Sequence, residues 1–143
     1  MIKETKNQFL LYFAWLVSLI ATMGSLYFSE IREFIPCEMC WYQRILMYPL
    51  VIILGLSILY KDVKIRRYVL PISLLGIATS SYHYALQKFP SLFPVSPCQE
   101  GVPCNIAYIN WFGFVTIPFL ALTGFTLITI FLLTIQEKKR GTK

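Results

Sequence analysis

Four long apolar stretches limit what this chain can fold into. Residues 9–28 and 112–135 contain no charged side chain, residues 41–60 contain only Arg44, and residues 68–86 contain only the titratable His83. A bilayer core about 30 Å thick needs about 20 apolar residues of helix to cross it. The pattern predicts an all-α membrane protein, a bundle of four transmembrane helices forming one integral membrane domain over residues 1–143.

The composition agrees with this prediction. The chain is 57% hydrophobic and 14% charged, whereas a typical soluble domain carries about 25% charged residues. Such a low charge excludes a disordered chain and argues against a water-soluble enzyme. The first apolar stretch is longer than the core of a usual signal peptide, so we expect it to be an uncleaved anchor.

Most of the basic residues lie on one side of the predicted membrane. Lys and Arg in short connections stay in the cytoplasm, and this rule predicts that both termini are cytoplasmic and that the first and third connections face outward. The chain is thus expected to be a multi-pass protein of the cell membrane. Its net charge of +6 then reflects topology rather than nucleic-acid binding. Ten of the 13 basic residues lie in the cytoplasmic segments: Lys3, Lys6, Lys61, Lys64, Arg66, Arg67, Lys138, Lys139, Arg140 and Lys143.

Two cysteine pairs occupy the two outward connections. Cys37 and Cys40 lie between the first two stretches, and Cys98 and Cys104 lie between the last two. Thiols on the outer face of a membrane can form and exchange disulfides, whereas cytosolic thiols are kept reduced. We therefore predict two catalytic, exchangeable pairs.

The first pair is a Cys-x-x-Cys at the amino end of the second predicted helix, directly after Pro36. Proline suits the first helical turn, and the positive end of the helix dipole favours the reactive thiolate. At about 100° per residue, Arg44 falls within roughly 60° of Cys37 and Cys40. An ionisable residue in a span suggests a functional role. Two other interpretations remain: Arg44 extends its charge to the interface, or the four cysteines bind zinc.

Five residues separate Cys98 from Cys104, and a ring this small restricts the unfolded chain by only about 2.4 kcal/mol. We expect an exposed, labile disulfide; a simple loop staple is the alternative. The lone histidine, His83, lies near the outer end of the third stretch. It is a candidate partner for a bound ring carbonyl, and a hydrogen bond between helices explains it equally well.

Electrons that reach the Cys-x-x-Cys pair need an acceptor. The sequence has no ligand set for haem or an iron–sulfur cluster and no glycine fingerprint for a flavin or nicotinamide. A lipid quinone of menaquinone or ubiquinone type remains. Cys40 would reach the quinone, and Arg44 would stabilise both the thiolate and the developing anion.

Two motifs support a family resemblance. The run Cys37–Arg44 (CEMCWYQR) and residues 108–113 (YINWFG), together with the four spans, resemble the DsbB family of disulfide bond formation membrane proteins, and most of all its Gram-positive branch. The resemblance implies a quinone-dependent protein-disulfide oxidoreductase. Such an enzyme reoxidises an extracytoplasmic thioredoxin-fold dithiol oxidase (DsbA-like, BdbD-type) and thereby supports disulfide formation in exported proteins.

The resemblance also implies roles for individual residues. The reduced partner would attack Cys98, the released Cys104 would attack Cys37, and Cys40 would engage the quinone. Arg44 would lie beside the quinone, and His83 corresponds to a quinone-proximal histidine. The best-known members separate the second pair by many more than five residues.

Two alternatives to this function remain open. One is a vitamin K epoxide reductase-like quinone reductase, although its reactive Cys-x-x-Cys lies late in the chain. The other is a non-catalytic membrane subunit with structural disulfides or zinc.

Overall fold

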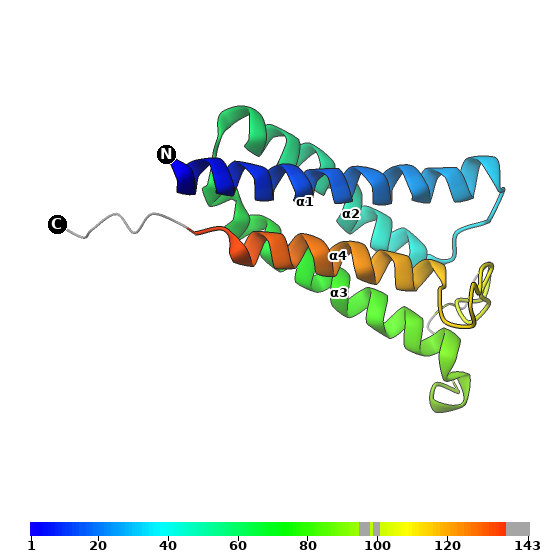
Figure 1. The fold of residues 1–143 in the computed structure, drawn as a ribbon. Helices are drawn as coiled ribbons and strands as arrows, with labels where there is room; N and C mark the ends of the chain where they lie inside the picture. Colours follow the sequence, from blue (N-terminus) through cyan, green and yellow to red (C-terminus); the bar gives the residue numbers. More distant parts are fainter. Residues whose placement is uncertain (95–97, 99–100, 137–143) are drawn as a thin grey trace.

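The computed structural model describes residues 1–94, 98 and 101–136. This part of the chain contains four long α-helices: α1 (Ile2–Leu26), α2 (Glu38–Tyr60), α3 (Arg66–Lys88) and α4 (Ile117–Thr134). They run side by side as an elongated bundle (Figure 1). Short helical turns follow α1 at Tyr27–Ile31, precede α3 at Val63–Ile65 and follow α3 at Pro90–Leu92. The predicted all-α bundle is confirmed.

Among the described residues, three helical segments are long and apolar enough to cross a membrane: Ile2–Ile31, α2 and α4. Helix α3 equals α2 in length at 23 residues but contains more polar side chains. Ser73, Ser80 and His83 of α3 are buried inside the bundle, where a polar group can be hydrogen-bonded. The fourth span therefore stays a prediction.

Helix α4 begins at Ile117, five residues after the start of the apolar run. Trp111 and Val115 instead form an isolated antiparallel bridge. The chain turns between them, with positive φ at Phe112 (54°) and Gly113 (80°). Hydrophobicity alone does not distinguish such an apolar turn from the first turn of a helix.

Helix α3 packs mainly against α4, and α1 packs against both α2 and α4. Gly76 lets the buried ring of Phe125 lie directly on α3, since a Cβ at residue 76 would be 2.3 Å from a ring carbon. Nearby, the Thr129 hydroxyl donates to Ser73 Oγ at 3.0 Å. The fully buried core includes Leu11, Ala14, Leu50, Leu54, Val69, Phe125, Ile128 and Leu132.

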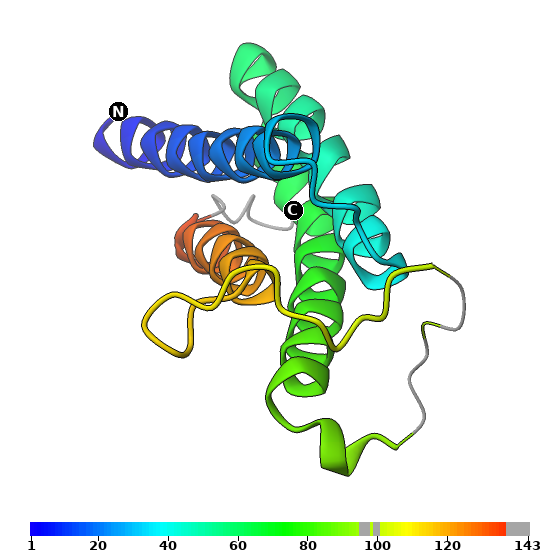
Figure 2. The same ribbon diagram turned by 90° about the vertical axis from the view of Figure 1, so that its right-hand side faces the viewer.

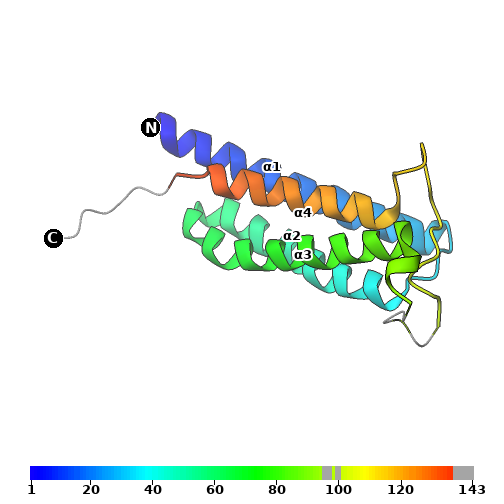
Figure 3. The same ribbon diagram turned by 90° about the horizontal axis from the view of Figure 1, so that it is seen from below.

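The connection at residues 27–37 and the described residues of the connection between α3 and α4 (89–94, 98 and 101–116) lie at the same end of the bundle (Figures 2 and 3). At the opposite end, Asn7 Nδ2 donates to the Gln136 carbonyl at 2.8 Å and ties α1 to the residues after α4. The predicted basic tail, Lys138, Lys139, Arg140 and Lys143, lies outside the described residues. Cytoplasmic termini remain a prediction.

Candidate functional site

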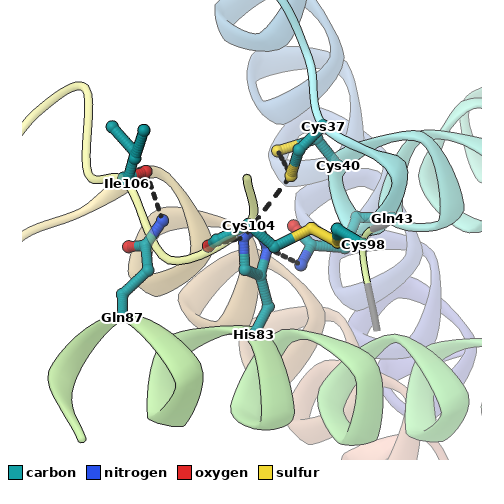
Figure 4. Close-up of a disulfide and its surroundings, with 8 residues drawn as sticks. All are labelled: Cys37, Cys40, Gln43, His83, Gln87, Cys98, Cys104 and Ile106. Carbon is teal, nitrogen blue, oxygen red and sulfur yellow. Dashed lines mark hydrogen bonds between the residues drawn. A yellow bond between two sulfur atoms is a disulfide. The ribbon is translucent and has the colours of Figure 1, made fainter. Parts of the chain in front are cut away.

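All four cysteines meet at one end of the bundle (Figure 4). Cys37, Cys98 and Cys104 are buried in one small cluster, and Cys40 packs against it. Cys37 and Cys40 come from the start of α2, whereas Cys98 and Cys104 come from the connection between α3 and α4. The fold thus brings together two pairs that are about 60 residues apart in the sequence.

Cys37 is the N-cap of α2, in extended conformation, and Cys40 lies in the first turn. Both are free thiols, and their sulfurs are 3.4 Å apart. The Cys40 thiol donates a hydrogen bond that lowers the pKa of Cys37 from 9.0 to about 4, with His83 assisting and burial opposing. The hydrogen bond thus favours the thiolate form of Cys37, which is the reactive form in disulfide exchange.

Cys98 and Cys104 form a disulfide with their Cα atoms 5.9 Å apart. The expectation of an exposed disulfide is wrong: Cys98 is only 9% exposed and Cys104 only 1%. The bond is covered because Leu86, Phe93 and Val102 pack in the same cluster. Of the two half-cystines, Cys98 is the more accessible. The neighbouring Pro97, Gln99 and Glu100 lie outside the described residues.

His83 projects from α3 between the two cysteine pairs and is fully buried. Its Nε2 is 3.6 Å from Cys37 Sγ and 3.2 Å from the Cys104 carbonyl oxygen. Its Nδ1 is 3.0 Å from Gln43 Nε2. Gln43 was not a candidate on sequence grounds, although it lies one helical turn after Cys40 on α2.

A cavity of about 440 Å³ lies beside the cysteine cluster, between α1, α2 and α4. Its walls are largely apolar, but Cys40, Gln43 and Arg44 also line it. The Arg44 guanidinium donates to the Ser25 carbonyl at 3.3 Å and lies 5.5 Å from the Trp41 ring centroid. Arg44 is therefore held at the cavity wall by a hydrogen bond and a cation–π contact.

The predicted site residues differ in whether they line the cavity. Cys40 and Arg44 line it, whereas Cys37 and His83 are not among the described residues that do so. The sulfurs of Cys37 and Cys104 and a ring nitrogen of His83 lie within 4.8 Å of one another. This triad has the residue types of a metal site, but the Cys104 sulfur is already bound to Cys98. The arrangement suits thiol–disulfide exchange between Cys104 and Cys37.

A family model described as disulfide bond formation protein DsbB matches residues 7–135. The chain is 57% identical over 129 residues to disulfide bond formation protein C of Bacillus subtilis, which covers 90% of this chain and 94% of the relative. It is 55% identical over 139 residues to the probable disulfide formation protein C of Halalkalibacterium halodurans, covering 96% of this chain and 100% of the relative.

A more distant relative is the probable disulfide formation protein of Coxiella burnetii, at 40% identity over 135 residues, covering 93% of this chain and 91% of the relative. No solved structure matches the chain. The similarity thus extends over both cysteine-bearing connections and all four helices.

Proposed function

The chain belongs to the DsbB family of disulfide bond formation proteins, and on this premise we propose that it is a thiol:quinone oxidoreductase. It takes electrons from a reduced thioredoxin-fold thiol oxidase of the DsbA-like, BdbD type outside the cytoplasm and passes them to a membrane quinone. The family and the names of the relatives support disulfide oxidoreductase activity. The donor and the acceptor are our proposal.

One observation carries this proposal: the two cysteines of the Cys37–Cys40 pair face different partners. Cys37 Sγ lies within 4.8 Å of Cys104 Sγ, and Cys40 lines the cavity together with Arg44. Electrons that enter at Cys37 can therefore leave at Cys40 without any movement of α2.

The cavity fits the head of a lipid quinone. Its walls are mostly apolar, which suits a substrate dissolved in the membrane, and it offers one fixed cation and one thiol. When bound there, a quinone of menaquinone or ubiquinone type would supply a two-electron, two-proton acceptor. Arg44 would stabilise negative charge at the cavity wall, both on the Cys40 sulfur and on a ring oxygen.

The relay begins at the second pair. A thiolate of the reduced partner attacks Cys98, breaks the Cys98–Cys104 bond and leaves a thiolate on Cys104. Cys104 attacks Cys37 of an oxidised Cys37–Cys40 pair and leaves the thiolate on Cys40, beside Arg44. Cys98 is the more exposed half-cystine, so it is the reasonable entry point for a protein partner.

The relay requires a particular topology. We propose that α3 is the fourth span, that both termini are cytoplasmic and that the connections bearing the cysteines face outward. The burial of the α3 polar residues inside the bundle supports this arrangement, because a helix can then present its apolar side to lipid.

The experiment is reduction of a short-chain quinone by the protein in nanodiscs, driven by a reduced thioredoxin-fold oxidase and followed by absorbance. Cys37→Ser and Cys40→Ser should each abolish turnover. Lys64→Gln, at an exposed residue before α3, is the matched control and should retain it. Cysteines inert toward both partner and quinone, together with stoichiometric zinc, would favour a non-catalytic subunit.

A further inference from the structure

We propose that His83 is a catalytic residue for the disulfide exchange between the two cysteine pairs, and that Gln43 is the positioning residue that orients its ring. The inference rests on the proposed relay, but it assigns His83 to the step between Cys104 and Cys37 rather than to the quinone. It also gives a role to Gln43, the buried polar residue of α2 that contacts His83.

Hydrogen bonding defines which ring nitrogen carries the proton. A carbonyl oxygen only accepts, so the 3.2 Å contact with the Cys104 carbonyl requires a proton on His83 Nε2. The amide nitrogen of Gln43 donates to Nδ1 at 3.0 Å, which leaves Nδ1 unprotonated. The ring is therefore neutral, and its single N–H also faces Cys37 Sγ at 3.6 Å.

The proton on Nε2 lies where a leaving sulfur needs it. The second thiolate of the partner first attacks its own sulfur in the mixed disulfide with Cys98, which leaves the partner oxidised and Cys98 as a thiolate. In the last exchange step, this Cys98 thiolate attacks Cys104 Sγ of the Cys37–Cys104 disulfide. The Cys98–Cys104 bond forms, the Cys104–Cys37 bond breaks, and its electron pair stays on Cys37 Sγ. His83 Nε2–H hydrogen-bonds this new thiolate. The products are a loop disulfide and a Cys37–Cys40 dithiol, the arrangement that the structure holds.

The ring has few charged neighbours. Helix α2 brings the thiols of Cys37 and Cys40, with Arg44 one turn further along. The connection after α3 brings a disulfide, which does not titrate. From α3 itself, the Lys88 ammonium donates to Asn110 at 3.1 Å and to the Gly113 carbonyl. Among the described residues, the titratable groups that face the ring are thus the thiols of Cys37 and Cys40.

The first test separates exchange from quinone reduction. In the intact protein, His83→Gln should slow partner-driven quinone reduction about 10- to 100-fold, the effect of losing one hydrogen bond to a charged sulfur. In a Cys98→Ser/Cys104→Ser background, dithiothreitol reduces the Cys37–Cys40 pair directly, and His83→Gln should slow quinone reduction much less than it does in the intact protein. If His83→Gln slowed quinone reduction equally in both backgrounds, the inference would be overturned and His83 would act in quinone reduction instead.

The second test needs no quinone. Oxidised protein is mixed with reduced partner, quenched in acid, alkylated, and mapped by mass spectrometry. His83→Gln should accumulate the Cys37–Cys104 disulfide, because its collapse is the slowed step. Rapid collapse as in the unmodified protein would refute the role of His83. A failure of the proposed function would give a different result. The unmodified protein would then exchange disulfides with the partner but would reduce no quinone, either with the reduced partner or with dithiothreitol.

Gln43 is tested by the pH profile of the same exchange. Gln43→Met keeps the size but removes the donor to Nδ1, so exchange should slow with little change in the profile. Gln43→Glu places a carboxylate, which accepts but does not donate, at Nδ1, and should change the pH profile of the exchange. A purely structural role would lower thermal stability in both variants and leave both profiles like that of the unmodified protein.

Discussion

Gly76→Ala should destabilise the bundle through a single steric conflict. A Cβ at residue 76 would lie 2.3, 2.4 and 2.6 Å from three ring carbons of Phe125, whereas carbon atoms in contact prefer about 3.5–4.0 Å. Helices α3 and α4 would have to separate by about 1 Å or more at this point. Because Phe125 is fully buried, the ring has no open space to enter.

The magnitude follows from two opposing effects. Overpacking a well-packed core costs about 1–3 kcal/mol, while replacing glycine by alanine inside a helix gains up to about 1 kcal/mol. Because three contacts would be shorter than 3 Å, the overpacking cost should lie in the upper part of that range, about 2–3 kcal/mol. The net loss should then be about 1–2 kcal/mol, a 5- to 30-fold shift toward the unfolded state. His83 lies two turns after Gly76 on the same helix, so the disulfide exchange rate should also fall.

Gly24→Ala is the matched control because a Cβ there meets no atom within 4 Å. It should keep or increase the free energy of unfolding. Titration with sodium dodecyl sulfate in detergent micelles, followed by tryptophan fluorescence, measures both variants. In a double-mutant cycle, Phe125→Leu should relieve part of the Gly76→Ala loss. A Gly76→Ala protein as stable as the original, or one that Phe125→Leu does not rescue, would refute this packing argument.

Three further results are expected. Arg44→Met should raise the KM for quinone by about 10-fold or more, because the quinone loses a hydrogen bond from a charged group. An unchanged KM would show that Arg44 does not bind the quinone. Gly24→Leu adds a side chain to a residue that lines the cavity, so it should block quinone reduction. Disulfide exchange with the reduced partner should continue, and mass spectrometry of the alkylated cysteines measures it. Cys40→Ala removes the hydrogen bond that lowers the pKa of Cys37 to about 4, so this pKa should rise. As the pH is lowered, the alkylation rate of Cys37 should therefore begin to fall at a higher pH in Cys40→Ala than in the unmodified protein, and identical profiles would contradict this cause.

Local patterns in the sequence predict much of the site. Cys40 and Arg44 are four residues apart in one helix, so helical periodicity alone places them on one side of α2, whereas Cys37 is the extended N-cap that precedes the helix. The cavity includes Cys40 and Arg44 as that face implies. The pairing of Cys98 with Cys104 is likewise a short-range feature, and the structure contains it.

Two expectations were wrong for physical reasons that sequence patterns do not contain. The loop disulfide is buried rather than exposed, because its cover comes from α2 and α3 as well as from its own connection. Helix α4 starts at Ile117 because residues 111–115 close a bridged turn. Both features depend on how one segment packs against another.

The sequence by itself determined the helical character and the grouping of the cysteines into two connections, since a bilayer sets the length of its apolar segments. Only the tertiary structure decided that His83 lies between the pairs, 46 residues from Cys37 and 21 from Cys104 along the chain. The rotation of α3 about its own axis decides which of its side chains face α2, and the packing of Phe125 of α4 on Gly76 is one contact that sets this rotation. Periodicity gives each helix its faces, but contacts between helices decide which faces meet.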